Sequence, residues 1–173
     1  IKDSQTVDYE ALRQTVKVGV RMQDNVIDAT PYFLDENKKQ ALGERRVGLG
    51  VMGLADLLIY CEKEYGSEEG NELVDQIFKT IAVAAYEQSI ELATERGSFP
   101  FLEGQTEAET ARLREAFINT GFMKKMPQHI RENIVANGIR NSHLLTVAPT
   151  GSTGTMVGVA TGLEPYFSFT YYR

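Results

Sequence analysis

Apolar residues recur every three or four positions in several stretches of the chain, a spacing that predicts amphipathic helices. The clearest stretch covers residues 67–96, where Ser67 can cap the first turn and Gly97 follows the last one. Similar patterns predict four further helices, over residues 6–28, 54–61, 106–121 and 127–136. The chain is therefore expected to be mostly helical.

Two short apolar runs have the composition of strands. Residues 143–148 (HLLTVA) read as a buried strand, and residues 166–172 (YFSFTYY) are a second candidate. Strands among many helices predict an α/β fold. The chain has 173 residues, 42% of them hydrophobic, and shows no repeat or low-complexity linker, so residues 1–173 are expected to form one segment of a single domain.

Charge and composition exclude several classes of protein. The formal net charge is −6 and no Lys/Arg block occurs, which argues against a nucleic-acid or anionic-membrane partner but leaves a small anionic ligand open. No apolar run reaches about 18 residues, and no signal peptide opens the chain. The chain starts without methionine and stops in an aromatic segment, which suggests a piece of a longer protein.

The residues that most often hold metals are scarce. Cys61 is the single cysteine, so no disulfide framework or Cys-based zinc site is expected, and a reducing, cytoplasmic location is favoured. His129 and His143 have no carboxylate pair at ligand spacing. We therefore predict no metal site, and Cys61 reads as a small buried hydrophobe.

The segment GLGVMG, residues 48–53, has the glycine spacing of a dinucleotide-binding loop. Such a loop also needs a buried strand before it, and the preceding residues include Arg45 and Arg46. Glycines that allow close backbone packing are the favoured interpretation. A dinucleotide-binding oxidoreductase fragment remains an alternative.

The segment LLTVAPTGSTGTMVG, residues 144–158, places an apolar run, a proline and a cluster of small hydroxyl residues before a possible helix. This order can direct free backbone amides and hydroxyls at an anion. No lysine follows the glycines, so the segment is not a Walker A loop. An ordinary helix cap is the competing interpretation, and spacing alone does not decide between them.

Three stretches resemble the large catalytic subunit of ribonucleotide reductases, in particular the adenosylcobalamin-dependent (class II) branch. They are residues 25–58 (NVIDATPYFLDENKKQALGERRVGLGVMGLADLL), residues 97–101 (GSFPF), and residues 142–168, which contain APTGST and GLEP. The similarity runs through nearly the whole chain in the same order. It implies that the chain is a mostly helical fragment of the family's ten-stranded α/β barrel, and that GLGVMG belongs to this barrel.

The resemblance implies a substrate site but no catalytic residue in this chain. In the family, the loop at PTGST holds the diphosphate or triphosphate of the substrate, a role that falls here on Thr150, Gly151, Ser152 and Thr153. The family's radical cysteine belongs to an N-x-C-x-E-type motif on a finger loop. That motif is absent from these 173 residues, and Cys61 lies inside a predicted helix.

The resemblance further implies an enzyme that converts ribonucleotides to deoxyribonucleotides by thiyl-radical chemistry, with this chain inactive alone. Adenosylcobalamin would be the cofactor of the complete enzyme, although no residue here is assigned to it. The partners would be the ribonucleotide substrate and the remainder of the reductase chain or a complementary subunit. Besides the dinucleotide-binding alternative, a ligand-free helical interaction module built on residues 67–96 stays open.

Overall fold

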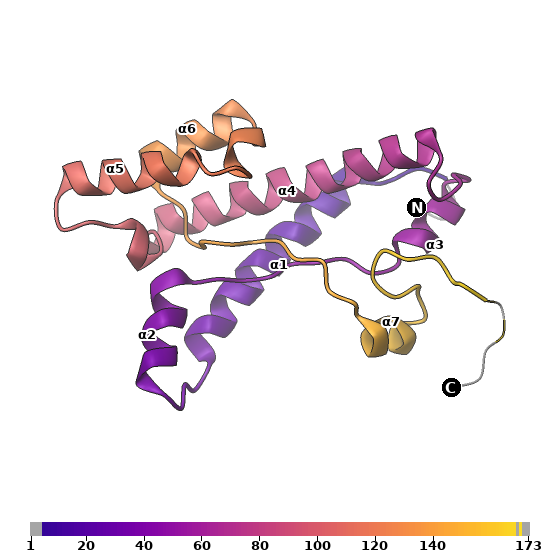
Figure 1. Cartoon of the computed structure of the whole chain (residues 1–173), viewed down its shortest axis with the longest axis horizontal. Helices are drawn as coiled ribbons and strands as arrows, with labels where there is room; N and C mark the ends of the chain where they lie inside the picture. The colour runs from indigo at the N-terminus through magenta and orange to yellow at the C-terminus, as the bar shows by residue number, and fades with distance from the viewer. Residues whose placement is uncertain (1–4, 169, 171–173) are drawn as a thin grey trace. The chain divides into compact units, whose positions relative to one another are not determined.

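The computed structural model describes residues 5–168 and residue 170, which are predominantly helical (Figure 1). In chain order the elements are α1 (Tyr9–Ala29), α2 (Asp35–Glu44), α3 (Leu54–Tyr60), α4 (Glu68–Arg96), η1 (Pro100–Leu102), α5 (Glu107–Ile118), η2 (Met123–Lys125), α6 (Gln128–Asn137) and α7 (Gly151–Val157). The chain divides into two compact units. The first unit is Ile1–Leu12, Gly50–Thr80 and Thr146–Arg173, and the second is Arg13–Leu49 and Ile81–Leu145.

The longer helices begin and end where capping residues predict. The hydroxyl of Ser67 accepts a hydrogen bond of 3.0 Å from the N–H of Gly70 at the start of α4. The same helix is followed by Gly97 in a left-handed conformation, φ 85°, which a residue with a side chain rarely adopts. Thr106 caps α5 by accepting from the N–H of Glu109 at 3.2 Å. These boundaries confirm the helices expected over 67–96 and 106–121, although α5 ends earlier, at Ile118.

Helix α2 was not predicted. Within it only Gly43 is buried, so the segment lacks the apolar stripe by which a surface helix is recognised in a sequence. Two acidic residues, Asp35 and Glu36, occupy its first turn, where negative charge is favourable. This charge placement was the available signal, and it is weaker than an apolar repeat.

The predicted α/β fold is wrong for the described part of the chain, which contains helices but neither a sheet nor a barrel. The run at 143–148 is extended and has one parallel neighbour, residues 47–49, to which Leu145 is bridged through Leu49. Leu144 is 1% exposed but Val147 is 64% exposed, so the run is not buried along its length. An apolar run predicts an extended conformation, whereas a sheet also needs a continuous ladder of hydrogen bonds to at least one partner strand, and among the described residues this run has an isolated bridge.

The second predicted strand, at 166–172, lies partly outside the described residues. Its described positions, 166–168 and 170, have no strand conformation. This part of the α/β prediction is therefore not supported either.

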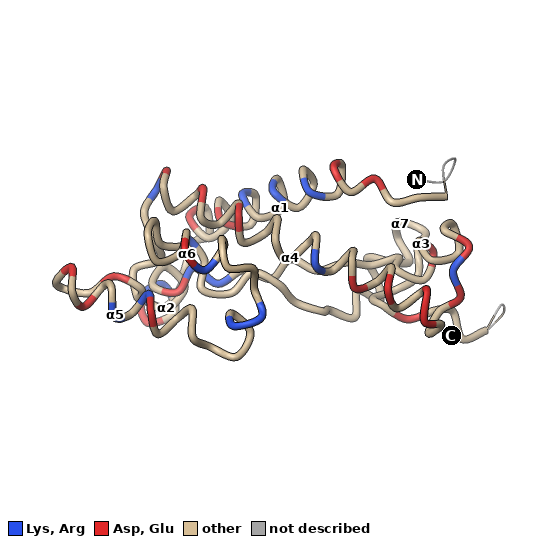
Figure 2. The backbone as a smooth tube through the Cα atoms, turned by 90° about the horizontal axis from the view of Figure 1, so that it is seen from above, with Lys and Arg blue, Asp and Glu red and all other residues tan. Residues whose placement is uncertain are grey.

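Ion pairs join α1 to α4 inside the second unit. Arg13 pairs with Glu87, Lys17 with Glu91, and Arg21 with Glu95. Figure 2 shows the basic members as successive blue turns of α1. Each pair advances by one turn along both helices, so the two helices run parallel here. The hydrogen bond from Arg21 lowers the pKa of Glu95, but pairs this exposed add little stability individually.

A buried carboxylate organises the second unit. Asp24 on α1 is fully buried and accepts hydrogen bonds from Nε of Arg45 at 2.9 Å and Nδ2 of Asn141 at 3.0 Å. The guanidinium of Arg45 also forms a two-point pair with Asp28, at 2.8 and 2.9 Å. Asn141 is itself fixed by Ser89 of α4, whose hydroxyl donates to Oδ1 and accepts from the backbone N–H. Every buried polar group in this cluster thus has a partner, as burial requires.

The same cluster sets the register of the two extended segments. Nδ2 of Asn141 donates to the carbonyl of Arg45 at 2.9 Å, and the N–H of Ser142 donates to the carbonyl of Glu44 at 3.1 Å. Beyond this point Val47 and Leu49 donate to the carbonyls of His143 and Leu144, at 3.0 and 2.8 Å respectively. Residues 45–49 therefore lie beside residues 141–145 in a fixed parallel alignment.

None of the helices in the part of the chain that the structure describes combines the length and apolar content needed to cross a membrane.

Asp24→Ala should lower the free energy of unfolding by about 3–5 kcal/mol, because it leaves buried donors of Arg45 and Asn141 without their acceptor. Urea unfolding of the chain measures this change. The matched control is Glu91→Ala, which breaks an exposed ion pair with Lys17 and should cost less than about 1 kcal/mol. Equal effects of the two substitutions would contradict the organising role of Asp24.

Asp28→Asn should weaken the dependence of stability on acid pH. The hydrogen bond from Arg45 holds the pKa of Asp28 below its ordinary value of 3.8. A carboxylate whose pKa is lowered by folding stabilises the protein above its unfolded pKa, and this contribution is lost as the pH falls through the folded value. Plots of unfolding free energy against pH should therefore be flatter below about pH 4 in the variant. Parallel plots for the two proteins would contradict a lowered pKa of Asp28 in the folded chain.

Candidate functional site

The hydroxyl-rich segment forms the first turn of α7 in the first unit. Thr150 precedes the helix in a left-handed conformation, with φ 49° and ψ 30°. The backbone N–H groups of Gly151, Ser152 and Thr153 have no hydrogen-bond acceptor among the described residues. Ser152 and Thr153 are exposed, and a Cβ built on Gly151 would meet open space. The helix starts earlier than the sequence suggested, so the small residues belong to the helix itself.

Hydrogen bonds from the following loop hold Thr150 in place. The N–H of Gly162 donates to Oγ1 of Thr150 at 2.8 Å, and the N–H of Gly154 donates to the carbonyl of Thr150 at 2.8 Å. The first of these bonds joins the APTGST and GLEP stretches. A hydroxyl that accepts one hydrogen bond keeps its proton, so the hydroxyl of Thr150 can still donate a hydrogen bond to a ligand.

Close packing explains why position 154 is glycine. A Cβ on Gly154 would lie 3.0 Å from Cγ2 and 3.2 Å from Cα of Thr161. Gly154 is buried, while Ser152 and Thr153 on the same turn are exposed. One side of the first turn of α7 thus packs on the chain, and the other presents hydroxyls and free amides to solvent.

The GLGVMG segment does not form a dinucleotide-binding loop. Gly53 precedes α3, but its N–H, which a pyrophosphate would need, donates to the carbonyl of Ala160 at 2.8 Å. A Cβ on Gly53 would lie 3.1 Å from Cβ of Val159, and one on Gly50 would lie 2.9 Å from the carbonyl oxygen of Thr146. Gly50 thus permits close approach of neighbouring backbone and Gly53 that of a neighbouring side chain, in line with the close packing favoured from the sequence.

Comparison with known proteins decides the family. The model of the family described as "Ribonucleotide reductase, barrel domain" matches residues 1–173. The chain belongs to this ribonucleotide reductase family. The resemblance predicted from the sequence is therefore confirmed, even though the described residues of the chain show no barrel.

Relatives of this ribonucleotide reductase chain come from distant organisms. It is 34% identical over 167 residues to the vitamin B12-dependent ribonucleoside-diphosphate reductase of Mycobacterium tuberculosis, covering 96% of the chain and 20% of the relative. It is 32% identical to the enzyme of the same description from Thermoplasma acidophilum, covering 100% of the chain and 19% of the relative. The large subunit of the Danio rerio ribonucleoside-diphosphate reductase is also 32% identical, over 100% of the chain and 22% of the relative. The chain thus spans about a fifth of the length of these relatives.

Cysteine and histidine are not assembled into a reactive centre in the described part of the reductase chain. Cys61 is 7% exposed at the end of α3, which confirms that it is a buried hydrophobe. Nδ1 of His143 lies 3.1 Å from the hydroxyl of Ser142, and Nε2 of His129 lies 3.8 Å from a carboxylate oxygen of Glu87. Within residues 5–168 and 170, no group of three or more potential metal ligands converges.

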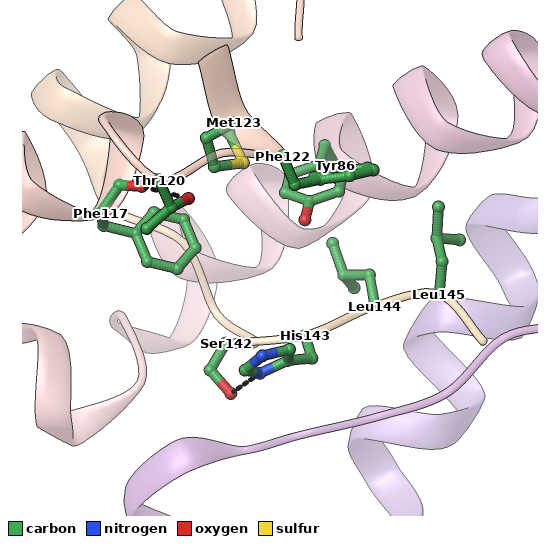
Figure 3. Close-up of a pocket in the computed structure, with 9 residues that line it drawn as sticks. All are labelled: Tyr86, Phe117, Thr120, Phe122, Met123, Ser142, His143, Leu144 and Leu145. Atoms are coloured by element: carbon green, nitrogen blue, oxygen red, sulfur yellow. Dashed lines mark hydrogen bonds between the residues drawn. The ribbon is translucent and has the colours of Figure 1, made fainter. Parts of the chain in front are cut away.

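A cavity of about 450 Å³ lies in the second unit, between α4, the end of α5, η2 and residues 142–145 (Figure 3). The ring of Tyr86 stacks on Phe122 with centroids 5.8 Å apart, and its oxygen points toward Leu144. Burial raises the pKa of Tyr86 to about 12, so its hydroxyl stays protonated at neutral pH. None of residues 150–153 lines this cavity.

The cavity does not fit a cobalamin. Its volume suits a drug-sized molecule, and a corrin ring with its nucleotide tail is larger. Its lining is mainly apolar, with His143 and Ser142 bonded to each other. This cavity therefore offers no cobalamin site.

Thr150→Val should expose the amide of Gly162 to faster hydrogen exchange, by roughly tenfold, because the acceptor of its hydrogen bond is lost while the side-chain size is kept. Exchange measured by nuclear magnetic resonance or mass spectrometry follows this amide. Thr150→Ser keeps the hydroxyl and should exchange at the original rate. An unchanged rate in the valine variant would show that the bond between the two stretches does not hold the loop.

Proposed function

We propose that this chain is the substrate-positioning segment of a ribonucleotide reductase and that residues 150–153 bind the phosphate groups of the ribonucleotide. The observation that carries the proposal is the row of three backbone N–H groups, from Gly151 to Thr153, without acceptors at the start of α7. Such amides attract anions, and the exposed hydroxyls of Ser152 and Thr153 add donors beside them.

Neutral donors suit a substrate that must leave after each turnover. The loop segment itself, residues 149–154, contains no lysine or arginine, so binding would depend on backbone dipoles and hydroxyls. A hydrogen bond from a neutral donor to an ionised phosphate is charge-assisted, and it is stronger than a bond between two neutral groups. Several such bonds can fix the phosphate tail without a positively charged side chain. Holding that tail orients the ribose relative to the reacting groups, an effect that can supply several kcal/mol of barrier reduction.

The complete enzyme would convert ribonucleotides to deoxyribonucleotides by thiyl-radical chemistry. The names of the relatives favour ribonucleoside diphosphates as substrates. Cys61 is buried at the end of α3 and lies outside any N-x-C-x-E-type motif. The radical cysteine would therefore come from the remainder of the reductase chain or from a complementary subunit. Alone, this chain would be inactive. We place the complete enzyme in the cytoplasm and treat residues 1–173 as one segment of its catalytic domain.

Adenosylcobalamin is the cofactor that we propose for the complete enzyme, where it would supply the initiating radical. The support is that the relatives from Mycobacterium tuberculosis and Thermoplasma acidophilum are described as vitamin B12-dependent. No residue of this chain is assigned to the cofactor. The part played by this chain is confined to holding and orienting the substrate.

The two alternatives from the sequence fit the geometry less well. A dinucleotide-binding fragment needs the N–H of Gly53 for its ligand, and that group already donates to Ala160. A helical interaction module without a ligand would have its loop amides satisfied internally, whereas those of Gly151, Ser152 and Thr153 have no acceptor among the described residues.

The double substitution Ser152→Ala and Thr153→Ala in the complete enzyme should raise the Michaelis constant for a ribonucleotide roughly tenfold and lower kcat/KM accordingly, because two donors to phosphate are lost. Steady-state kinetics with CDP measure both constants, and circular dichroism checks that the fold is intact.

The matched control is Thr30→Ala, which removes an exposed hydroxyl that follows α1 and donates to the carbonyl of Val26 in that helix. It should leave both kinetic constants unchanged. Unchanged kinetics in the loop variant would contradict the phosphate-binding role.

A further inference from the structure

Both backbone polar groups of Ala160 are bonded to the first turn of α3. The carbonyl of Ala160 accepts from the N–H of Gly53 at 2.8 Å, and its N–H donates to Oδ2 of Asp56 at 2.5 Å. Ala160 is 1% exposed, so water does not compete for these groups. Residues 159–162, which follow α7, are therefore attached to α3 at two points. We call these residues the return segment.

The return segment is also bonded to the loop that starts α7. The N–H of Val159 donates to the carbonyl of Gly154 at 3.0 Å. The N–H of Gly162 donates to the hydroxyl of Thr150 at 2.8 Å. These two bonds bracket the attachment at Ala160, so a displacement of the return segment would move both ends of the 150–154 loop.

Helix α3 is a firm support for this attachment. Three of its seven residues, Leu54, Ala55 and Leu58, are buried. The absence of a side chain at Gly53 lets Val159 approach the helix start, where an added Cβ would lie 3.1 Å from Cβ of Val159. The return segment thus packs closely against the first turn of α3. Asp56 is the charged residue of that turn.

We propose that Asp56 is a positioning residue for the substrate. By holding the N–H of Ala160, its carboxylate fixes the return segment, which in turn fixes the orientation of the free amides at Gly151, Ser152 and Thr153. The inference rests on the proposed phosphate-binding role of that loop. Asp56 acts through the backbone and does not itself touch the substrate.

Capping of α3 alone does not account for this geometry. A carboxylate in the first turn of a helix commonly accepts from an N–H of the same turn. Here the partner of Asp56 is Ala160, which is 104 residues away in the sequence. A hydrogen bond from a backbone N–H to an ionised carboxylate is among the stronger kinds, as suits a contact that must hold a loop still.

The test uses the complete reductase with CDP as substrate. Asp56→Ala should raise the Michaelis constant about tenfold and change kcat by less than about threefold, because the phosphates are held less well while the reacting groups are intact. A general loss of stability would instead lower the fraction of active enzyme, and therefore kcat, without changing the Michaelis constant. Asp56→Asn keeps an oxygen acceptor of the same reach and should restore the Michaelis constant to within about threefold of the original.

Asp75→Ala is the matched control. It removes an exposed carboxylate from α4 in the same unit, and both kinetic constants should stay unchanged. If Asp56→Ala does not fold, Asp56→Ser replaces it, since a hydroxyl on this shorter side chain does not reach the N–H of Ala160.

The outcomes separate the two proposals. A normal Michaelis constant in Asp56→Ala, beside a raised one in the Ser152→Ala and Thr153→Ala variant, overturns the positioning role and leaves phosphate binding in place. Equal Michaelis constants in the alanine and asparagine variants also overturn it, because the hydrogen bond would then not be the cause. Normal kinetics in the loop variant overturn the phosphate-binding role itself.

Discussion

The constraint on which the second unit depends is the burial of the Asp24 carboxylate. A fully buried carboxylate is tolerated only with donors around it, and the chain supplies Arg45 and Asn141 from two distant segments. Satisfying one side chain of α1 therefore brings the end of α2 beside the segment that follows α6. The parallel alignment of residues 45–49 with 141–145 is a consequence of this requirement, since two backbone hydrogen bonds alone would specify it weakly.

The pairing leads, along the chain, into the two segments that form the candidate site. In the first unit, Gly50 lies so close to the carbonyl of Thr146 that a Cβ would be 2.9 Å from its oxygen. From there one segment continues through Gly53 into α3, and the other continues into the loop at Thr150. The glycine motif that suggested a nucleotide pyrophosphate thus permits close packing, and the loop that we propose to bind phosphate lies in the other segment.

Sequence patterns predicted the helices well where an apolar stripe and caps coincide. Helices α1, α4, α5 and α6 lie close to their expected ranges, whereas α2, which buries little, has no such stripe and was missed. The strand prediction failed for a different reason. Alternation and apolar content describe the conformation of one segment, but the number of strands beside it is a property of the tertiary fold, and the extended run at 143–148 has one short neighbour among the described residues.

The candidate site also has a part that the local sequence could predict and a part that it could not. The loop at residues 150–153 could be recognised because glycine, serine and threonine before a helix have a local physical meaning: free amides and short hydroxyls. Gly162 and Asp56, which lie 12 and 104 residues from their hydrogen-bond partners, carry no such local signal. In its sequence Asp56 is one more acidic residue in the first turn of a short helix. The feature that distinguishes Asp56 is its hydrogen bond from the N–H of Ala160. Nearly every residue has such a backbone group, so only the tertiary fold shows which one Asp56 accepts from.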